Sequence, residues 1–519
     1  MREFEALIGV LLVATLLAAL ARRAGAPYPA FLALGGAVLA FLPGAPRITI
    51  QPEVALALFV APVLLDAAYD MSPRDLRDHW VPVTSLAVVS VILTTIAVAF
   101  VVRRLVPGMP LAAAVALGAI VAPPDAAAAT AVLRQLRPPH RVLTILEGES
   151  LLNDATSLLI YRLAVGAVAM SAFSVQSAAP SLLVIVAGSA ALGLALSWLT
   201  LRLTRAIRDV PTAVIVQFAT TFGVWILADR LDLSPVLTMV CFAISVARRA
   251  PASTPARIRI PSYAVWETAV FLLNVLAFVY IGLQIRPILS SLDPDVRERY
   301  LWVAGIILAT VILVRIAWVL LHTSVALAWI RRFGFHPRRP IQPPTFKGGV
   351  VISWAGMRGI ISLAAAAALP DDFPYRGLIV LTAFAVVLGT LVVQGLTLRP
   401  LIQALDLKDD DPVGREVEAA RSRALDAAFA SLDNYPSPAA ESVRHELVAH
   451  LGGEPESGEG ETADEWSGPT SHQEIHRRVL SEARRVVFDM RAREEIGDDA
   501  FHRLEEELDW LEMGVEARG

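Results

Sequence analysis

Three carboxylates, Glu147, Glu149 and Asp154, lie close together in a segment that is otherwise apolar. A charged side chain at the depth of a lipid bilayer is costly unless it is paired or hydrated, so acids in such a place mark a candidate functional site. On a helix, Ser150 and Asp154 share one face because they are four residues apart. Glu149 and Asn153 share the adjoining face. A carboxylate beside a hydroxyl and an amide suits a proton or a small cation, whereas a carboxylate opposite an arginine forms a structural pair.

The sequence around these acids predicts a membrane protein. Hydrophobic residues make up 55% of the 519 residues, and up to about residue 405 they recur in blocks of roughly 17–25 residues, the length that crosses a bilayer as a helix. The fold class we predict is therefore an all-α polytopic membrane protein. About thirteen transmembrane helices are expected, near residues 6–21, 29–42, 52–69, 81–102, 111–133, 142–170, 180–201, 212–228, 234–247, 263–285, 301–328, 348–369 and 376–402.

The placement of arginines predicts the orientation in the membrane. If the N-terminus is outside, the loops on the inner side hold a clear excess of arginine, as at residues 202–208 and 248–259. This is the positive-inside pattern. We therefore expect a multi-pass protein of the cell membrane, with its N-terminus outside and its C-terminus in the cytoplasm.

From about residue 406 the chain becomes hydrophilic. Helical patterns near residues 413–433, 438–451, 471–495 and 499–516 flank an acidic stretch at 452–471, which has too little apolar surface to fold by itself. We predict a transmembrane domain at 1–405 and a helical cytoplasmic tail at 406–519, with a flexible segment at 452–471. We assign no chemistry to the tail.

Two of the expected spans contain signals for a helix break. In the fifth span, two prolines precede Asp125, and because proline removes a backbone donor and clashes with the preceding turn, the helix should stop there. In the twelfth span, Gly356 and Gly359 flank Arg358. Interrupted helices at corresponding positions of two halves indicate the binding site of a secondary transporter. We predict two inverted six-helix repeats whose broken helices cross at the midplane.

Several of these segments resemble those of a known family. Residues 145–156 resemble the EGESLLNDA segment of the sodium/proton antiporters in the first branch of the monovalent cation:proton antiporter superfamily. Residues 354–359 are similar to that family's GGLRG segment, and residues 61–66 to its PLLFE segment. Asn274 and Gly282 fall where the tenth span of the family usually has Asn and Gly. The resemblance covers residues 1 to about 405.

The resemblance implies a role for each residue of the binding site. Asp154 is the carboxylate that binds the cation when it is ionised and releases it when it is protonated. Asn153 precedes it in the family's Asn-Asp pair, and Ser150 contributes a hydroxyl to the ion. Asp66 is expected to face the site from the neighbouring domain. The cation, Na+ or K+, is transported at Asp154 and is not a fixed metal.

Other charged residues are expected to support the structure. By resemblance, Glu149 pairs with Arg358 of the broken twelfth span and stays charged. Asp125 lies at the break of the fifth span. Arg315, in the eleventh span, is expected to bind backbone carbonyls or the Asp125 break and so hold the helices together.

The chain departs from the family pattern at two places. The fifth span reads Pro124-Asp125-Ala126 where the family usually has Thr-Asp-Pro, so the threonine ligand is missing and only the backbone carbonyl of Pro124 could replace it. The acid of the third span is Asp66, which is one methylene shorter than the usual glutamate. Ion selectivity follows the number and distance of the ligands, so the choice among Na+, K+ and Li+ stays open.

The predicted activity is secondary active transport. One buried carboxylate, Asp154, must be neutralised by either a proton or a cation to cross a low-dielectric barrier, and this competition gives obligatory exchange. We expect electroneutral exchange of Na+ for H+, with K+ as the alternative, and a part in pH homeostasis. By resemblance the protein is a homodimer, and a core domain moves against a dimerisation domain by elevator-type alternating access.

Other classes of function fit the sequence less well. A cation channel should show a continuous polar lining, whereas the polar groups here converge on one level. An intramembrane hydrolase needs a nucleophile with a base or a set of metal ligands, and we place no histidine at membrane depth. We therefore expect a transporter and not an enzyme, without a cofactor. Its partners are monovalent cations, protons, the lipid bilayer and a second copy of the chain, and no nucleic acid.

Overall fold

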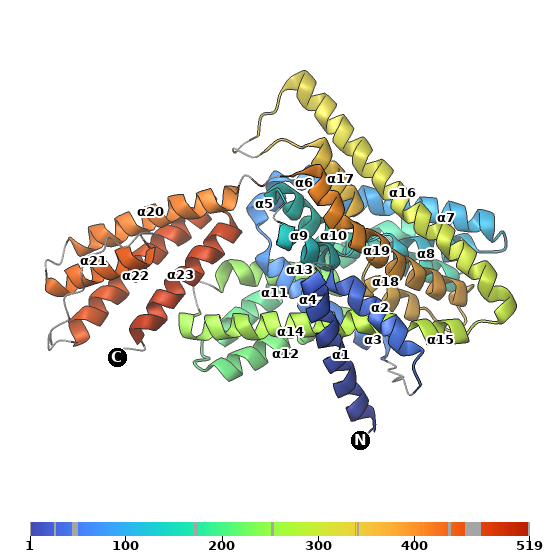
Figure 1. Ribbon diagram of the computed structural model, residues 1–519, viewed down its shortest axis with the longest axis horizontal. Helices are drawn as coiled ribbons and strands as arrows, with labels where there is room; N and C mark the ends of the chain where they lie inside the picture. Colours follow the sequence, from blue (N-terminus) through green and yellow to red (C-terminus); the bar gives the residue numbers. More distant parts are fainter. Residues whose placement is uncertain are drawn as a thin grey trace.

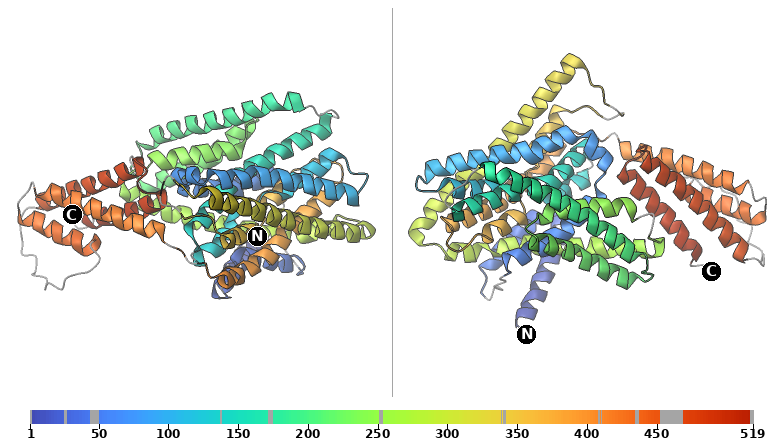
Figure 2. Two further views of the ribbon diagram at one scale, coloured as in Figure 1. Left: turned by 90° about the horizontal axis from the view of Figure 1, so that it is seen from above. Right: turned by 180° about the vertical axis from the view of Figure 1, so that it is seen from behind.

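The computed structural model is helical, as predicted. It describes residues 2–24, 27–43, 50–136, 138–170, 175–250, 254–337, 339, 342–407, 409, 411–433, 437–451 and 469–516, and these include no β-strand. Figure 1 shows a large bundle of helices with the C-terminal helices beside it, and the two further views also place these helices outside the bundle (Figure 2). The all-α class is therefore confirmed.

Helices lie in all of the ranges that were predicted as spans. They are α1 (Arg2–Ala24), α2 (Tyr28–Ala40), α3 (Pro52–Ala55) with η1 (Leu56–Val60) and α4 (Ala61–Asp70), α6 (Trp80–Thr84) with η2 (Ser85–Ser90) and α7 (Val91–Leu105), α8 (Leu111–Val121) with α9 (Ala126–Leu136), α10 (His140–Met170), α11 (Val175–Thr204), α12 (Val210–Arg230), α13 (Pro235–Arg249), α14 (Ala256–Leu283), α16 (Pro294–Phe333), α17 (Phe346–Trp354) with α18 (Ile360–Ala367), and α19 (Arg376–Leu405). Two short helices, α5 (Pro73–Asp78) and α15 (Ile285–Ser290), lie between spans.

Within the described residues, 8 helical segments are long and apolar enough to cross a membrane by length and composition. The helices α2 and α8 are apolar but shorter. A polytopic membrane protein is therefore supported, and the exact number of thirteen spans stays a prediction.

Both predicted helix breaks are present. The helix α8 ends at Val121 and α9 begins at Ala126, and α17 ends at Trp354 and α18 begins at Ile360. The helix α8 is apolar on all sides, and most of its residues are buried, as expected for a helix in the interior of a bundle. It packs against α7 and α10. The broken segments therefore lie among other helices, where their freed backbone groups can find partners.

The hydrophilic tail forms its own small bundle. Its helices are α20 (Pro412–Leu432), α21 (Pro438–Leu451), α22 (Pro469–Ala492) and α23 (Asp498–Glu516). Their apolar faces meet in a core that includes Val443, Val487 and Phe501, which are at most 1% exposed. Most of the segment that was predicted to be flexible, residues 452–468 of 452–471, lies outside the described residues.

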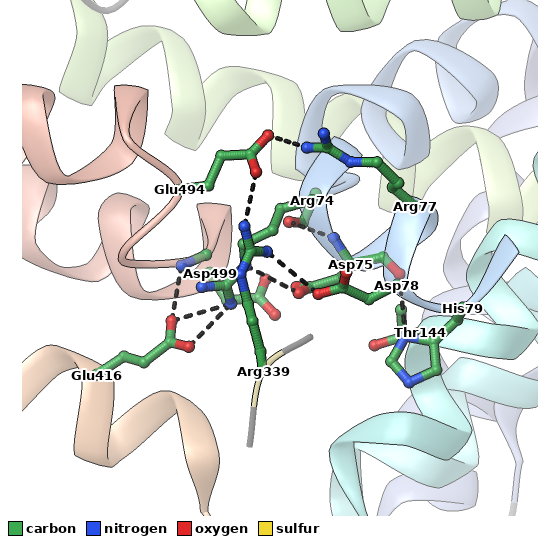
Figure 3. A network of polar contacts seen from close by, with 12 residues as sticks. Arg74, Asp75, Arg77, Asp78, His79, Thr144, Arg339, Glu416, Glu494 and Asp499 are labelled. Carbon is green, nitrogen blue, oxygen red and sulfur yellow. Dashed lines mark hydrogen bonds and ion pairs between the residues drawn. The ribbon is translucent and has the colours of Figure 1, made fainter. Parts of the chain in front are cut away.

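Ion pairs hold one end of the tail against α5 (Figure 3). Arg74 donates to both carboxylate oxygens of Glu416 at 2.9 and 3.1 Å, and Arg77 pairs with Glu494. Arg339 then bridges the two sides, because it donates to Asp78 at 3.1 Å and to Glu494 at 2.6 Å. The sequence analysis gave none of these residues a role, and the structure shows that they make a joint between the tail and the bundle.

A second set of ion pairs joins α23 to the ends of bundle helices. Arg259 of α14 lies 2.7 Å from Glu505 and 2.6 Å from Asp509, and all three side chains are at most 4% exposed. The Nε2 atom of His140, at the start of α10, lies 2.9 Å from Asp499. Burial raises the pKa of Asp499, but the hydrogen bond and the charge of His140 outweigh it, so this pKa lies below its usual range.

Candidate functional site

The helix α10 carries the acids of the site at mid-length. Asp154 is 5% exposed, Glu149 is 1% exposed and Asn153 is fully buried. Within the described residues, the Asp154 carboxylate has no hydrogen bond and no ion pair. A buried carboxylate without such partners is costly in its charged form, so binding of a proton or a cation there is favoured.

The break between α8 and α9 lies against the face of α10 that carries Asn153. Asn153 donates its side-chain amide to the carbonyl oxygen of Pro124 at 2.8 Å. Asp125 directly precedes the first residue of α9. Its carboxylate accepts a hydrogen bond from the backbone N–H of Ala127 at 2.9 Å, which is the contact of a helix N-cap. The break is thus held in place by α10 on one side and by its own acid on the other.

The two broken helices contact each other at their breaks. The backbone N–H of Asp125 donates to the carbonyl oxygen of Met357 at 2.6 Å. Gly359 makes this crossing possible, because a Cβ atom at that position would lie 1.7 Å from the Asp125 carboxylate. No side chain larger than hydrogen fits there, so a glycine is required by space and not by backbone conformation.

Arg358 binds backbone carbonyls at the crossing. Its guanidinium donates to Val121 at 3.2 Å, to Ala122 at 3.3 Å and to the carbonyl of Gly356, and its backbone N–H donates to the Thr390 hydroxyl at 3.0 Å. The last carbonyls of a helix have no partner within the helix. Arg358 supplies donors to the end of α8, where water is excluded.

The prediction that Glu149 pairs with Arg358 is wrong. Glu149 pairs with Arg315 of α16, whose Nη1 and Nη2 atoms lie 2.6 and 2.9 Å from the two carboxylate oxygens. Arg315 also donates to the carbonyl of Ile352 at 3.1 Å. Gly356 leaves room for this arginine, since a Cβ atom there would lie 2.3 Å from its Cδ. The ion pair with Glu149 thus belongs to Arg315, and Arg358 instead binds carbonyls at the end of α8 and at its own break.

A cavity of about 290 Å³ opens beside Asp154. It brings together four residues of the predicted site, which are Asp154, Ser150, Asp66 and Asp125. The walls include apolar side chains such as Phe59. The other predicted residues, Asn153, Glu149, Arg315 and Arg358, hold the helices around this cavity through the contacts given above.

The cavity also contains polar residues to which the sequence analysis gave no role. They are Asp70, Thr130 and Glu147, and Asn274 was noted only as part of the resemblance. Helical spacing could have indicated two of them, because Glu147 lies two turns before Asp154 and Asp70 lies one turn after Asp66. Thr130 gave no such signal. It follows a run of alanines and reaches the cavity only because α9 restarts at the break.

These groups can coordinate an alkali cation. Carboxylate and hydroxyl oxygens are hard ligands, which suit small cations of low polarisability. Among the described residues, no three His, Cys, Asp or Glu side chains are placed to hold a metal ion together. In that part of the chain, a bound cation would therefore have at most two of these side chains as ligands, with hydroxyl, carbonyl or water oxygens completing its shell.

Comparison with known proteins places the chain in a family. The description "Sodium/hydrogen exchanger, transmembrane" belongs to a family model that matches residues 9–404. The chain belongs to the sodium/hydrogen exchanger family. This exchanger is 31% identical to a protein of Mycobacterium tuberculosis named as an Na+/H+ exchanger, over 93% of this chain and 91% of that protein. It is 30% identical to a sodium, potassium, lithium and rubidium/H+ antiporter of Bacillus subtilis, over 71% of this chain and 56% of that protein.

A solved structure supports the fold of the exchanger. The sodium proton antiporter MjNhaP1 from Methanocaldococcus jannaschii superposes with a TM-score of 0.59 and 17% sequence identity, over 78% of this chain and 99% of that one. At this identity the likeness concerns the fold alone. The transmembrane part of the exchanger therefore has the fold of an antiporter, as the broken helices predicted.

Proposed function

We propose that this exchanger moves a monovalent cation across the membrane in exchange for H+. The observation that carries the proposal is the Asp154 carboxylate, which is buried, lines the cavity with Ser150, and has no hydrogen bond or ion pair within the described residues. The family assignment over residues 9–404 supports the same class of transport.

One carboxylate that serves two ions explains the exchange. Asp154 is neutral when it holds a proton or a monovalent cation, and the bare anion crosses a low-dielectric barrier poorly. Each cycle then moves one positive charge in each direction, so the exchange is electroneutral. Asn153 adds no second titrating group, because its amide is a neutral donor to the Pro124 carbonyl.

The transport step we propose is elevator-type alternating access within a homodimer. The crossing of the broken helices is supported by the Asp125–Met357 hydrogen bond and by the carbonyl contacts of Arg358, so these segments should move together as a core domain. The core includes the fifth, sixth and twelfth predicted spans, so Asp154 of α10 would move with it against a dimerisation domain. The two inverted six-helix repeats belong to this proposal, since they explain why both breaks occur at one level.

For the whole chain we propose a transmembrane domain at 1–405 and a cytoplasmic tail at 406–519. The N-terminus then lies outside the cell membrane. The arginine excess in the inner loops supports this orientation. It also places the tail, α5 and the start of α10 on the same side of the membrane, as their ion pairs require.

Na+ is the preferred cation in our proposal, with K+ as the alternative. The Bacillus subtilis relative is named for sodium, potassium, lithium and rubidium, whereas the Mycobacterium tuberculosis relative is named for Na+. The carboxylate of Asp66 ends one methylene short of a glutamate, and because selectivity follows the distances of the ligands, K+ is kept as the alternative.

Transport by purified protein in liposomes tests the proposal. A pH-sensitive dye inside the vesicles reports proton movement when Na+, K+ or Li+ is added outside, with the membrane voltage either free or clamped. We expect proton movement that needs a monovalent cation and does not depend on voltage. A current carried by cations alone would instead indicate a channel.

The variant Asp154→Asn should abolish this exchange, because its amide can bind neither a proton nor a cation as a carboxylate does. Asp229→Asn is the matched control, since Asp229 pairs with the exposed Arg162 at 3.2 Å away from the cavity. The proposal fails if the folded Asp154→Asn protein exchanges at the wild-type rate.

A further inference from the structure

A second cavity lies where α11 and α13 end. It has a volume of about 350 Å³ and is lined by Leu194, Trp198, Leu201, Arg202, Arg205 and Arg249. Three of these six residues are arginines and none is acidic. None of the six takes part in the exchange site described above.

The residues of α11 that line the cavity lie on one side of the helix. Leu194, Trp198 and Leu201 recur at spacings of four and three, and Arg202 lies beside Leu201 in the last turn of α11. Arg205 follows directly after the helix ends at Thr204. Residues at these spacings lie above one another on a helix. The side of α11 that lines the cavity is therefore apolar within the helix and basic at its C-terminal end.

The third arginine comes from the neighbouring helix. The helices α11 and α13 pack closely, and the Ser197 hydroxyl donates to the Ser245 hydroxyl at 2.8 Å. Arg249 donates to the same Ser245 oxygen at 2.9 Å. This contact holds the stem of Arg249 along α13, so that its guanidinium lies at the cavity with those of Arg202 and Arg205.

The cavity is apolar at one end and basic at the other, which matches the acyl chains and the anionic head group of a phospholipid. Leu194 and Trp198 are 52% and 60% exposed and belong to a helix that is long and apolar enough to cross a membrane, where such side chains face lipid. The guanidinium carbon of Arg202 lies 5.7 Å from the centre of the Trp198 ring. Tryptophan prefers the boundary between acyl chains and head groups. Basic cavities between transmembrane helices at this level bind the phosphates of anionic lipids.

We propose that this cavity, formed by Leu194, Trp198, Leu201, Arg202, Arg205 and Arg249, binds one anionic phospholipid of the membrane. The phosphate lies among the three guanidinium groups, which can each donate two parallel hydrogen bonds to phosphate oxygens. An acyl chain lies along Leu194 and Trp198. The lipid thereby bridges the ends of α11 and α13.

Lipid retention by the purified full-length protein tests the proposal. The protein is mixed with equal amounts of phosphatidylglycerol and phosphatidylcholine in detergent, and native mass spectrometry counts the lipids that remain bound. We expect one phosphatidylglycerol to be retained in preference to phosphatidylcholine. Phosphatidylglycerol should also raise the midpoint of thermal unfolding. Equal retention of the two lipids by the wild-type protein would overturn the proposal without any variant.

A matched pair of triple variants locates the site. Arg202→Gln with Arg205→Gln and Arg249→Gln should weaken retention by about tenfold or more and remove the thermal shift. The control combines Arg208→Gln, Arg248→Gln and Arg257→Gln, which removes the same charge from exposed arginines outside the cavity. The control should bind lipid as the wild type does. Equal loss in both variants would overturn the proposal in favour of general attraction to a basic surface.

Two further outcomes would also contradict a lipid site. If inorganic phosphate gives the same thermal shift as phosphatidylglycerol, the cavity is a site for free anions. If no lipid is retained and the variant Trp198→Cys forms a crosslink between two copies of the chain, a second copy covers the cavity. These measurements do not use transport, so their result is independent of the exchange activity proposed above.

Discussion

Glu149 and Arg315 form an ion pair with two hydrogen bonds, 2.6 and 2.9 Å long, between side chains that are each 1% exposed. The pair joins α10, which carries Asp154, to α16. Because the guanidinium and the carboxylate meet in parallel, the pair fixes orientation as well as distance. Because Glu149 takes both terminal nitrogens of Arg315, this arginine is not the partner of Asp154 on the same helix.

Removing one member of this pair should be more damaging than removing both. Glu149→Leu or Arg315→Met alone leaves a buried charge without its partner, at a cost of about 3–5 kcal/mol. The double variant replaces the pair by apolar groups and should recover much of that loss. Thermal unfolding in detergent measures the three variants against the wild type. Simply additive losses would contradict the pairing.

Arg358 should act on stability through carbonyl groups and not through Glu149. Arg358→Met leaves the carbonyls of Val121, Ala122 and Gly356 without this donor, and each lost contact costs about 1–3 kcal/mol. We expect a low yield and an unfolding midpoint well below the wild type. In a double variant with Glu149→Gln the two losses should be coupled much less than those of Glu149 and Arg315. Coupling as strong as in the Glu149–Arg315 pair would restore the original expectation of a Glu149–Arg358 pair.

Gly359→Ala should disrupt the crossing of the broken helices. Its Cβ would overlap the Asp125 carboxylate at 1.7 Å, so either the N-cap of α9 or the Asp125–Met357 hydrogen bond must break. We expect a loss of transport together with a lower unfolding midpoint. The control is Gly305→Ala in α16, where no atom lies within 4 Å of the new Cβ. That change should be neutral or stabilise the helix by up to ~1 kcal/mol.

Ser150→Ala should weaken cation binding more than it slows the transport cycle. The change removes one hydroxyl oxygen from the cavity beside Asp154 and leaves the carboxylate in place. Loss of one such contact is worth ~1.4 kcal/mol, or roughly tenfold in the half-saturating cation concentration. Thr268→Ala serves as control, because the Thr268 hydroxyl bonds to its own helix at Ala264. An unchanged half-saturation for Ser150→Ala would remove the hydroxyl from the list of ligands.

The tail should detach when Arg259 is replaced. Arg259→Met leaves the buried Glu505 without this arginine and Asp509 with Arg484 as its remaining arginine, at a cost of up to about 3–5 kcal/mol. Limited proteolysis should then cut the chain between α19 and α20 faster than in the wild type. Arg485→Met is the control, since Arg485 is 68% exposed and pairs with Glu482 on its own helix. Exposed pairs contribute about 0–1 kcal/mol. Equal cleavage of both variants would contradict a buried joint.

The positions of the helices could be predicted from the sequence because they follow from local chemistry. Runs of apolar residues of bilayer length and the prolines before Asp125 act within one continuous segment of the chain, so the helices and both breaks lie where they were expected. The convergence of Asp66, Ser150 and Asp154 also followed, through the resemblance of two separate segments.

The partner of each buried arginine could not be predicted in the same way. Arg315 and Arg358 are both long, buried and cationic, and either can reach a carboxylate or a carbonyl. Only the path of the chain through the break turns Arg358 toward Val121 and leaves Glu149 to Arg315. The contacts of the tail could not be predicted either. Glu416 and Arg74 are 342 positions apart, and each is of a residue type that is common on protein surfaces.

The hydrogen bond from Asp125 to Met357 ties the length of one helix interruption to that of the other. An insertion of one residue at 122–125 would shift the amide away from its acceptor, unless a matching change occurred at 355–359. Over evolutionary time, the two interruptions should therefore gain or lose residues together or not at all, although more than two hundred positions of sequence separate them.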